Sequence, residues 1–444
     1  MRKQLATKTG AIAATVGAAV GLGNIWRFPY EVGSNGGGAF MVVYLASILL
    51  LGVPIMLSEF VIGRHTRQNA KSAIDTLRPK RHHYDGYLLI LCGIMFFSFY
   101  SVVGGWVLYF LYESVAGGLQ GHSPEEYSEL FSAFVGNPYT ITGCTLLFIL
   151  INFVILQRGI TKGIEKISNI LMPFLFLIII IFCANSLMMP GAAKGLEFMF
   201  NPDFSVMSPE IVVAAMGQAF FSLSLGLGCV LTYASYFSQS TSLVKTATMT
   251  VVLDTLVAVL SGVMIFPALF SFGAEPTAGP KLVFEVLPNI FQQLPGAYFW
   301  AVAFFVLLFF ACITSSISMA EIPTAFFTES FKIGRTKALA FTTIIGVAFG
   351  ILCSLSFNVL ADFKVFGKSF FDLFDFVTSS IFMPVGGLMF TILVGWLIDK
   401  RILEQELTNN GTLKVRSFKV LRFCIRYVAP AAILLIFFYS WGVI

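Results

Sequence analysis

The chain has 444 residues, of which 57% are hydrophobic and only 11% are charged. A soluble domain carries about 25% charged residues, so this composition excludes a soluble globular protein, a disordered chain, a collagen and a disulfide scaffold. The net charge of +5 is small and sits in short clusters between apolar runs, which argues against a nucleic-acid partner. The seven Cys lie in or at the edge of apolar runs without metal or redox spacing, and we expect them to be small core residues.

Apolar segments long enough to cross a bilayer follow one another along the whole chain. We expect helices, because every backbone group in lipid needs an internal partner, and the alternation of a membrane barrel is absent. No cleavable signal peptide is expected, and residues 1–444 are expected to form one membrane domain. The eleven predicted spans are 10–35, 38–63, 87–117, 139–157, 166–189, 209–237, 243–272, 297–328, 336–357, 370–398 and 420–442.

The basic residues predict the orientation of these spans. If the N-terminus is cytoplasmic, 23 of the 28 Lys and Arg residues fall in the terminal tail and loops on the cytoplasmic side. Lys and Arg are enriched in cytoplasmic loops, so we expect the N-terminus inside and, after eleven spans, the C-terminus outside.

Two spans carry a Gly-Leu-Gly sequence near their middle, at residues 21–23 in the first and 226–228 in the sixth. Each Gly costs about 1 kcal/mol of helix propensity relative to Ala. Close helix packing through small residues is the alternative explanation. Because spans one and six correspond in two five-span halves, we favour unwound stretches, which expose carbonyls to cations and helix N-termini to anions. Such a site suits a zwitterionic amino acid.

Ionisable residues within spans are costly and usually functional. Five occur here: Arg27, Glu59, Asp254, Glu321 and Asp375. Each can instead be a satisfied pair inside the bundle. Asp254 stands alone among apolar neighbours and favours a cation or proton as partner. The hydroxyls of Thr314-Ser315-Ser316 either bond back to helix carbonyls or serve as hard oxygen ligands for sodium.

The sequence contains no enzyme constellation. All four His lie in predicted loops, and neither HExxH nor a Walker A motif occurs. We therefore expect no enzymatic activity. A membrane enzyme acting on lipids, a proton-coupled permease and a sensor that binds amino acid without transport remain as rival hypotheses.

At this point specific motifs resemble those of a known family. The run Gly21-Leu-Gly-Asn-Ile-Trp-Arg-Phe-Pro29, followed by Asn35-Gly-Gly-Gly-Ala-Phe40, resembles the signature of the neurotransmitter:sodium symporters, in their bacterial amino-acid branch. Later motifs agree in order and spacing, so the resemblance covers essentially the whole chain: Glu59, Tyr233-Ala-Ser-Tyr236, Thr314-Ser-Ser-Ile-Ser318 and Phe374-Asp-Phe376.

The resemblance implies an all-α polytopic fold with the leucine-transporter-type architecture. Its two inverted five-helix repeats would occupy about 10–189 and 209–398, with spans one and six broken and an extra helix at 420–442. The substrate and ion sites would lie between spans 1, 3, 6 and 8.

It also implies a set of site residues. The substrate would be bound by Ala18, Ala19, Leu22, Gly23, Phe96, Tyr100, Phe221, Ser222, Ser224, Leu227, Ser315 and Met319. The first sodium would be held by Ala19, Asn24, Ser222 and Asp254, and the second by Gly17, Val20, Ala311, Thr314 and Ser315. Arg27 and Asp375 resemble an outer gate, and Arg2, Glu329 and Tyr236 an inner gate.

Several residues depart from the family pattern, and they bear on the ion dependence and the substrate that we expect. Asp254 stands where Asn is common, and Ala258 stands where chloride-dependent relatives carry Ser. The charge that chloride would supply is therefore already present, and we expect chloride-independent transport. Leu5 replaces a Trp often packed at the inner gate. No charge faces the expected side-chain pocket, which disfavours charged substrates.

The sequence thus predicts a sodium-coupled symporter that imports hydrophobic or aromatic L-amino acids by alternating access. We expect two sodium ions, no chloride, a small-molecule substrate, and a monomer or weak homo-oligomer. The expected location is the bacterial inner membrane.

Overall fold

The computed structural model describes residues 4–78, 85–273 and 282–442. Within these residues the regular structure is helical, apart from one isolated bridge between Val365 and Lys368. Arg2, predicted for the inner gate, lies outside the described residues.

Nine helices of the described ranges are long and apolar enough to cross a membrane. Some contain a π-helical turn, so one span can comprise more than one labelled helix. Their bounds are Gly38–Thr66 (α3 and α4), Asp85–Ala116 (α6), Pro138–Gln157 (α8), Ile160–Leu187 (ending in α9), Leu243–Ser271 (α13), Ala297–Ser330 (α15), Arg335–Leu355 (α16), Phe370–Leu397 (α17 and α18) and Phe418–Ser440 (α20 and α21).

Two broken spans complete the bundle. α1 (Lys8–Ala19) and the helix Gly23–Ser34, which ends in α2 (Phe28–Ser34), pass as one span with a bend of 53°. α11 (Pro209–Ser222) and α12 (Cys229–Ala234) occupy the sixth predicted segment, and each is too short to cross a bilayer alone. With both pairs included, the arrangement is consistent with the predicted eleven spans.

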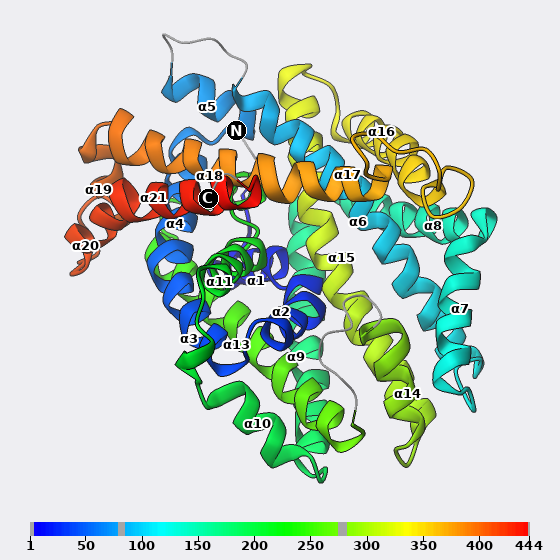
Figure 1. Ribbon diagram of the computed structural model, residues 1–444. Coiled ribbons are helices and arrows are strands. Elements are labelled where there is room, and N and C mark those ends of the chain that lie inside the picture. Colours follow the sequence, from blue (N-terminus) through cyan, green and yellow to red (C-terminus); the bar gives the residue numbers. More distant parts are fainter. Residues whose placement is uncertain (1–3, 79–84, 274–281, 443–444) are drawn as a thin grey trace.

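Shorter helices cover the two ends of the bundle. They are α5 (Ala70–Leu77), α7 (Pro124–Gly136), α10 (Ala192–Phe200), α14 (Leu287–Gln292) and α19 (Lys400–Thr408). In Figure 1, α7, α10 and α14 lie along the bottom and lower right, whereas α5 and α19 lie at the upper left.

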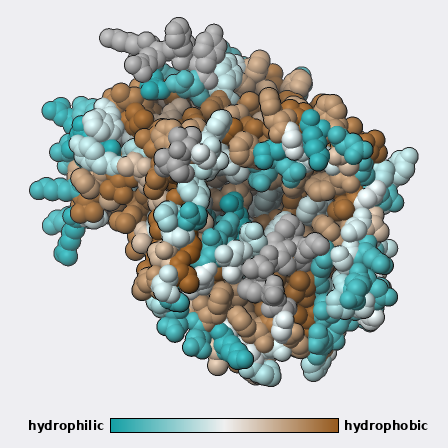
Figure 2. Space-filling model, in the orientation of Figure 1, coloured by the Kyte–Doolittle hydropathy of each residue, from teal (hydrophilic) through white to brown (hydrophobic). Residues whose placement is uncertain are grey.

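The broken helices lie in the interior of the bundle (Figure 1). α1 packs against α9, α13 and α15, and α12 packs against α4 and α15. Two glycines let the unwound sixth span approach α18, because a Cβ on Gly386 would come within 2.1 Å of the Gly226 carbonyl oxygen. The surface is apolar over large areas, as Figure 2 shows for one face, with polar residues gathered in patches. Leu49 and Ile344 are typical, at 66% and 64% exposed. A bilayer is the solvent that suits such a surface.

Candidate substrate and ion site

The first span is interrupted between α1 and Gly23. Val20 and Gly21 leave the regular helix, and the carboxamide of Asn24 accepts a hydrogen bond of 3.0 Å from the Gly21 N–H. Asn24 thereby satisfies a backbone group that the break would leave without a partner. The predicted unwinding of this span is observed at the Gly-Leu-Gly sequence.

The sixth span is interrupted over residues 223–228. Ser224, Gly226 and Gly228 have φ of 51°, 80° and 88°, the left-handed region that a continuous α-helix excludes. Ser224 is the one non-glycine among the three, and its hydroxyl donates to the Ala18 carbonyl at 3.2 Å. The two breaks therefore face each other and share a hydrogen bond.

A buried carboxylate stabilises the second break. Glu59 of α4 accepts hydrogen bonds from the N–H groups of Gly226 at 2.8 Å and Leu231 at 3.3 Å. Gln218 adds a second link, donating from Nε2 to the Gly23 carbonyl at 2.8 Å. The sequence marked Glu59 only as an ionisable residue within a span. Its partners are backbone groups more than 160 positions away, which no local pattern reveals.

The residues predicted for the first sodium come together around Asp254 of α13. Asn24 Nδ2 donates to Asp254 Oδ1 at 2.8 Å, and the Ser222 hydroxyl donates to Oδ2 at 2.7 Å. Asn24 and Ser222 lie 2.9 Å apart, and all three are buried. The carbonyl of Ala19 lies at the end of α1, next to the break. In the described part of the chain, no Lys or Arg pairs with Asp254. The cluster thus holds a carboxylate that has no cationic partner and is surrounded by other oxygen atoms able to bind a cation.

The residues predicted for the second sodium gather where α1 packs on α15. The Ser315 hydroxyl lies 2.9 Å from the Val20 carbonyl and 3.5 Å from the Gly17 carbonyl. Thr314 donates to the Phe310 carbonyl at 2.8 Å and approaches the Ala311 carbonyl at 3.2 Å. The helix back-bonding considered from the sequence is therefore present for Thr314, and its hydroxyl oxygen still has lone pairs for a cation. Hard cations prefer such oxygen ligands.

Residues predicted to bind the substrate surround the first break. The Leu22 N–H donates to the Tyr100 hydroxyl at 3.4 Å, and the Phe96 ring lies 6.0 Å from Tyr100 and 6.1 Å from Phe221. Ala18, Leu227 and Met319 are buried. Among the predicted substrate residues that the structure describes, none is charged.

An open cavity of about 740 Å³ leads from the surface to this region. Leu22, Gly23, Tyr100 and Phe221 line it, together with Arg27 and Asp375 of the predicted outer gate. Arg27 does not form an ion pair with Asp375. Its Nε lies 3.3 Å from Glu31, and its guanidinium stacks 4.3 Å from the Phe221 ring. The gate residues therefore face one cavity without closing it.

Two residues of the predicted inner gate, Glu329 and Tyr236, lie in the described part of the chain. Glu329 accepts hydrogen bonds from the backbone and side chain of Asn69 at 2.7 and 3.0 Å. The Tyr236 hydroxyl donates to Glu321 at 2.7 Å, and Glu321 pairs with Arg335 at 2.6 Å. The sequence named Glu321 only as an ionisable residue and did not associate it with Tyr236.

The geometry of the site defines a class of protein. Secondary transporters have sites of this kind: buried oxygen atoms that can bind a cation lie between two broken helices, and an open cavity leads to them. In the described residues, no group of three or more His, Cys, Asp and Glu side chains is placed to bind a metal. The donors that do converge combine one carboxylate with amides, hydroxyls and carbonyls.

Comparison with known proteins gives the family. Residues 2–128 and 133–443 match the model of the sodium:neurotransmitter symporter family. The chain belongs to this family, which confirms the resemblance read from residues 21–40.

Two curated relatives are uncharacterized sodium-dependent transporters. One is YhdH of Bacillus subtilis (strain 168), 37% identical, with 99% of this chain and 98% of the relative covered. The other, from Haemophilus influenzae, is 36% identical, with 98% of this chain and 97% of the relative covered. A solved structure, MhsT in complex with L-phenylalanine, matches with a TM-score of 0.91 and 39% identity over 99% of this chain and 100% of that chain. The all-helical fold and the transporter class are therefore shown.

Proposed function

We propose that the protein couples the inward movement of sodium to the uptake of hydrophobic or aromatic L-amino acids by alternating access. The observation that carries the proposal is the cluster of Asn24, Ser222 and Asp254 at the meeting point of the two broken helices. It places oxygen ligands for a cation next to the backbone N–H groups of the first break, which could bind a carboxylate.

The amino acid is expected to lie across the two breaks. Its carboxylate would meet the N–H groups of Leu22 and Gly23 and the Tyr100 hydroxyl, and its amine would meet carbonyls of Ala19, Phe221 and Ser222 and the Ser224 side chain. Helix N-termini favour negative charge, which suits the carboxylate. Phe221, which already lies under Arg27, would close over the bound molecule.

The side chain of the substrate is expected to be apolar. Ala18, Phe96, Leu227 and Met319 are all buried, and a charged substituent among them would lose its hydration without gaining a partner. The complex of MhsT with L-phenylalanine supports an aromatic substrate for this similar fold.

Sodium at the first site would be held by Ala19, Asn24, Ser222 and Asp254, with the substrate carboxylate alongside. Each would then stabilise binding of the other, which is the reciprocal coupling that symport requires. A second sodium would be held by Gly17, Val20, Ala311, Thr314 and Ser315. The membrane potential adds about 2.3 kcal/mol per charge per 100 mV to this driving force.

The presence of Asp254 at the first sodium site is the argument for chloride-independent transport. A fixed carboxylate supplies the negative charge at the first sodium site, and Ala258 offers no hydroxyl to an anion. Replacing chloride by gluconate at constant sodium should leave uptake unchanged, and a large loss would refute this part of the proposal.

We further propose one domain of two inverted repeats, 10–189 and 209–398, with the N-terminus in the bacterial cytoplasm and the C-terminus outside. Arg27 and Asp375 would form the outer gate, and Arg2, Glu329 and Tyr236 the inner gate. A monomer or weak homo-oligomer in the inner membrane is expected to suffice, because each site is built from one chain.

The decisive experiment measures sodium-dependent binding of the twenty amino acids, followed by uptake into proteoliposomes with an inward sodium gradient. Saturable uptake of a hydrophobic or aromatic amino acid that stops when potassium replaces sodium supports the proposal. Uptake that persists without sodium and follows a pH gradient would indicate the proton-coupled alternative. Binding without uptake would indicate a sensor.

A further inference from the structure

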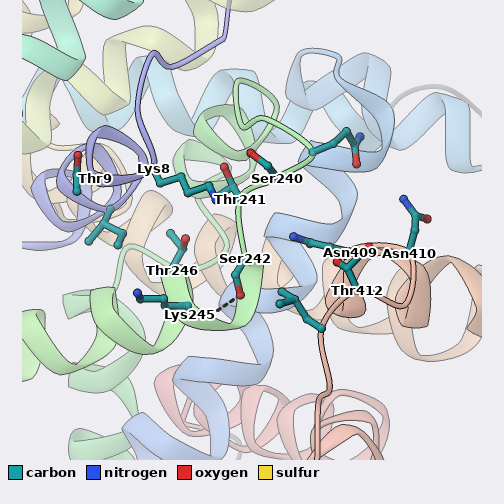
Figure 3. A pocket seen from close by; sticks show the side chains of 13 residues that line it. Lys8, Thr9, Ser240, Thr241, Ser242, Lys245, Thr246, Asn409, Asn410 and Thr412 are labelled. Atoms are coloured by element: carbon teal, nitrogen blue, oxygen red, sulfur yellow. Dashed lines mark hydrogen bonds between the residues drawn. The ribbon is translucent and has the colours of Figure 1, made fainter.

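A second cavity, of about 710 Å³, lies where α1 and α13 begin. Lys8 is fourteen residues before Leu22, or about 20 Å along a helix, so this cavity is separate from the substrate site. In Figure 3 the start of α1, the connection between α12 and α13, and the turn after α19 surround one space. Its lining consists of Lys8, Thr9, Ile12, Gln239, Ser240, Thr241, Ser242, Lys245, Thr246, Asn409, Asn410, Thr412 and Leu413.

The lining of the cavity carries two positive charges and no negative one. Lys8 and Lys245 are the charged residues of this lining, which contains neither Asp nor Glu. No ion pair to either ammonium group is found in the described part of the chain, whereas Lys71 of α5 pairs with Asp75 at 2.6 Å. Figure 3 shows the Lys8 side chain reaching toward Thr241. Two unpaired cations in a concave site attract an anion.

Hydrogen-bond donors surround the same space. Thr246 is only 2% exposed, yet its hydroxyl has no partner within the described residues and is directed into the cavity in Figure 3. Ser261 on the same helix shows the usual alternative, donating to the Val257 carbonyl at 2.8 Å. The first turn of α13 also begins here, and helix N-termini carry partial positive charge. The start of α1 differs, because the Glu165 carboxylate already accepts hydrogen bonds from the Ala6 and Thr7 N–H groups at 2.8 and 3.1 Å.

We propose that this cavity binds a phosphate group, supplied by an anionic phospholipid headgroup or by free inorganic phosphate. Phosphate oxygens are strong acceptors that match two ammonium groups and several hydroxyl and amide donors. Ile12 and Leu413 add apolar surface beside the polar donors. Basic pockets between the ends of membrane-spanning helices are suited to lipid headgroups. A bound phosphate joins three segments that are distant in sequence and stabilises the start of α1 against α13.

The test compares purified wild-type protein with the double variant Lys8→Gln/Lys245→Gln. Lys337→Gln is the matched control, because Lys337 is an exposed lysine of α16 outside the cavity. Native mass spectrometry of delipidated protein titrated with phosphatidylglycerol or phosphatidylcholine measures lipid binding. Thermal melting in inorganic phosphate, against chloride at equal ionic strength, measures binding of the free ion. Thr246→Val removes the unpartnered hydroxyl with little change in volume.

We expect wild type and Lys337→Gln to bind phosphatidylglycerol at least tenfold more tightly than the double variant, and Thr246→Val to bind several-fold more weakly than wild type. A melting shift with inorganic phosphate that the double variant loses would identify the free ion as the source. Equal binding by wild type and double variant, or no binding of either ligand by wild type, would overturn the proposal. If the double variant does not fold, the single variants Lys8→Gln and Lys245→Gln replace it.

Discussion

Asn24 Nδ2 donates a hydrogen bond of 2.8 Å to Asp254 Oδ1, joining the first broken helix to α13. The same amide group lies 2.9 Å from the Ser222 hydroxyl of the other broken helix. A cation that enters between these three side chains therefore contacts both breaks at once, which links ion binding to the geometry of the substrate site.

Removing the carboxylate should remove this link. Asp254→Ala deletes the charge in a buried site, so we expect sodium-dependent amino-acid binding to fall at least tenfold, or about 1.4 kcal/mol. Scintillation proximity binding over a sodium titration measures the change. Full retention of sodium-dependent binding would contradict the proposed role of Asp254.

The second sodium site is tested by two serines on α15. The Ser315 hydroxyl reaches the Val20 carbonyl across the helix interface, whereas the Ser318 hydroxyl donates to the Ser315 carbonyl of its own helix. We expect Ser315→Ala to raise the sodium concentration for half-maximal uptake several-fold. Ser318→Ala, the matched control, should leave it unchanged. Equal effects of both variants would argue against a second site here.

Glu59 should be important for stability. It satisfies two backbone N–H groups of the sixth span, and Glu59→Gln exchanges one acceptor oxygen for an amide donor. An unsatisfied buried group costs roughly 1–3 kcal/mol, so we expect a lower melting temperature in detergent. Glu404→Gln, on an exposed position of α19, should melt like wild type. An unchanged melting temperature for Glu59→Gln would contradict the proposed role of Glu59 in stabilising the break in the sixth span.

Arg27 is expected to affect transport more than equilibrium sodium binding. Its guanidinium stacks on Phe221 and faces the cavity shared with Asp375. Arg27→Gln loses stacking and charge, so we expect uptake to fall by more than tenfold, with Arg27→Lys intermediate. Lys364→Gln, exposed and outside this cavity, is the control. A loss of sodium binding as large as the loss of uptake would place Arg27 in ion binding instead.

The attachment of α19 should depend on pH. Burial by itself raises the pKa of Glu406, but its hydrogen bond with His65 and the Arg64 guanidinium outweigh this, and the net pKa is below the usual value. A carboxylate with a lowered pKa stabilises the fold above its unfolded pKa of about 4.3 and loses this contribution as pH falls through the folded pKa. Hydrogen exchange of residues 400–408 should therefore be slow at pH 7 and accelerate below about pH 4 relative to the intrinsic rate. Protection that does not change across this range would contradict the prediction.

Much of the architecture could be predicted from the sequence, because membrane solvation acts locally. Each apolar run must satisfy its backbone within itself, so the spans follow from composition alone. The breaks at residues 21–23 and 226–228 also follow from local chemistry, because paired glycines in both halves disfavour a continuous helix. The run from Gly21 to Phe40 was specific enough to indicate the family.

Only the tertiary structure decided which buried polar groups are partners. Glu59 with the Gly226 N–H, and Glu321 with Arg335 and Tyr236, join residues on different helices. Arg27 pairs with Glu31 rather than Asp375 because both lie on one helical face, four residues apart. The cavity between Lys8 and Lys245 likewise exists only once three distant segments meet. Hydropathy determines that a segment enters the membrane. The pairing of charges within the bundle depends instead on how the helices pack, and a single sequence carries no local signal of that packing.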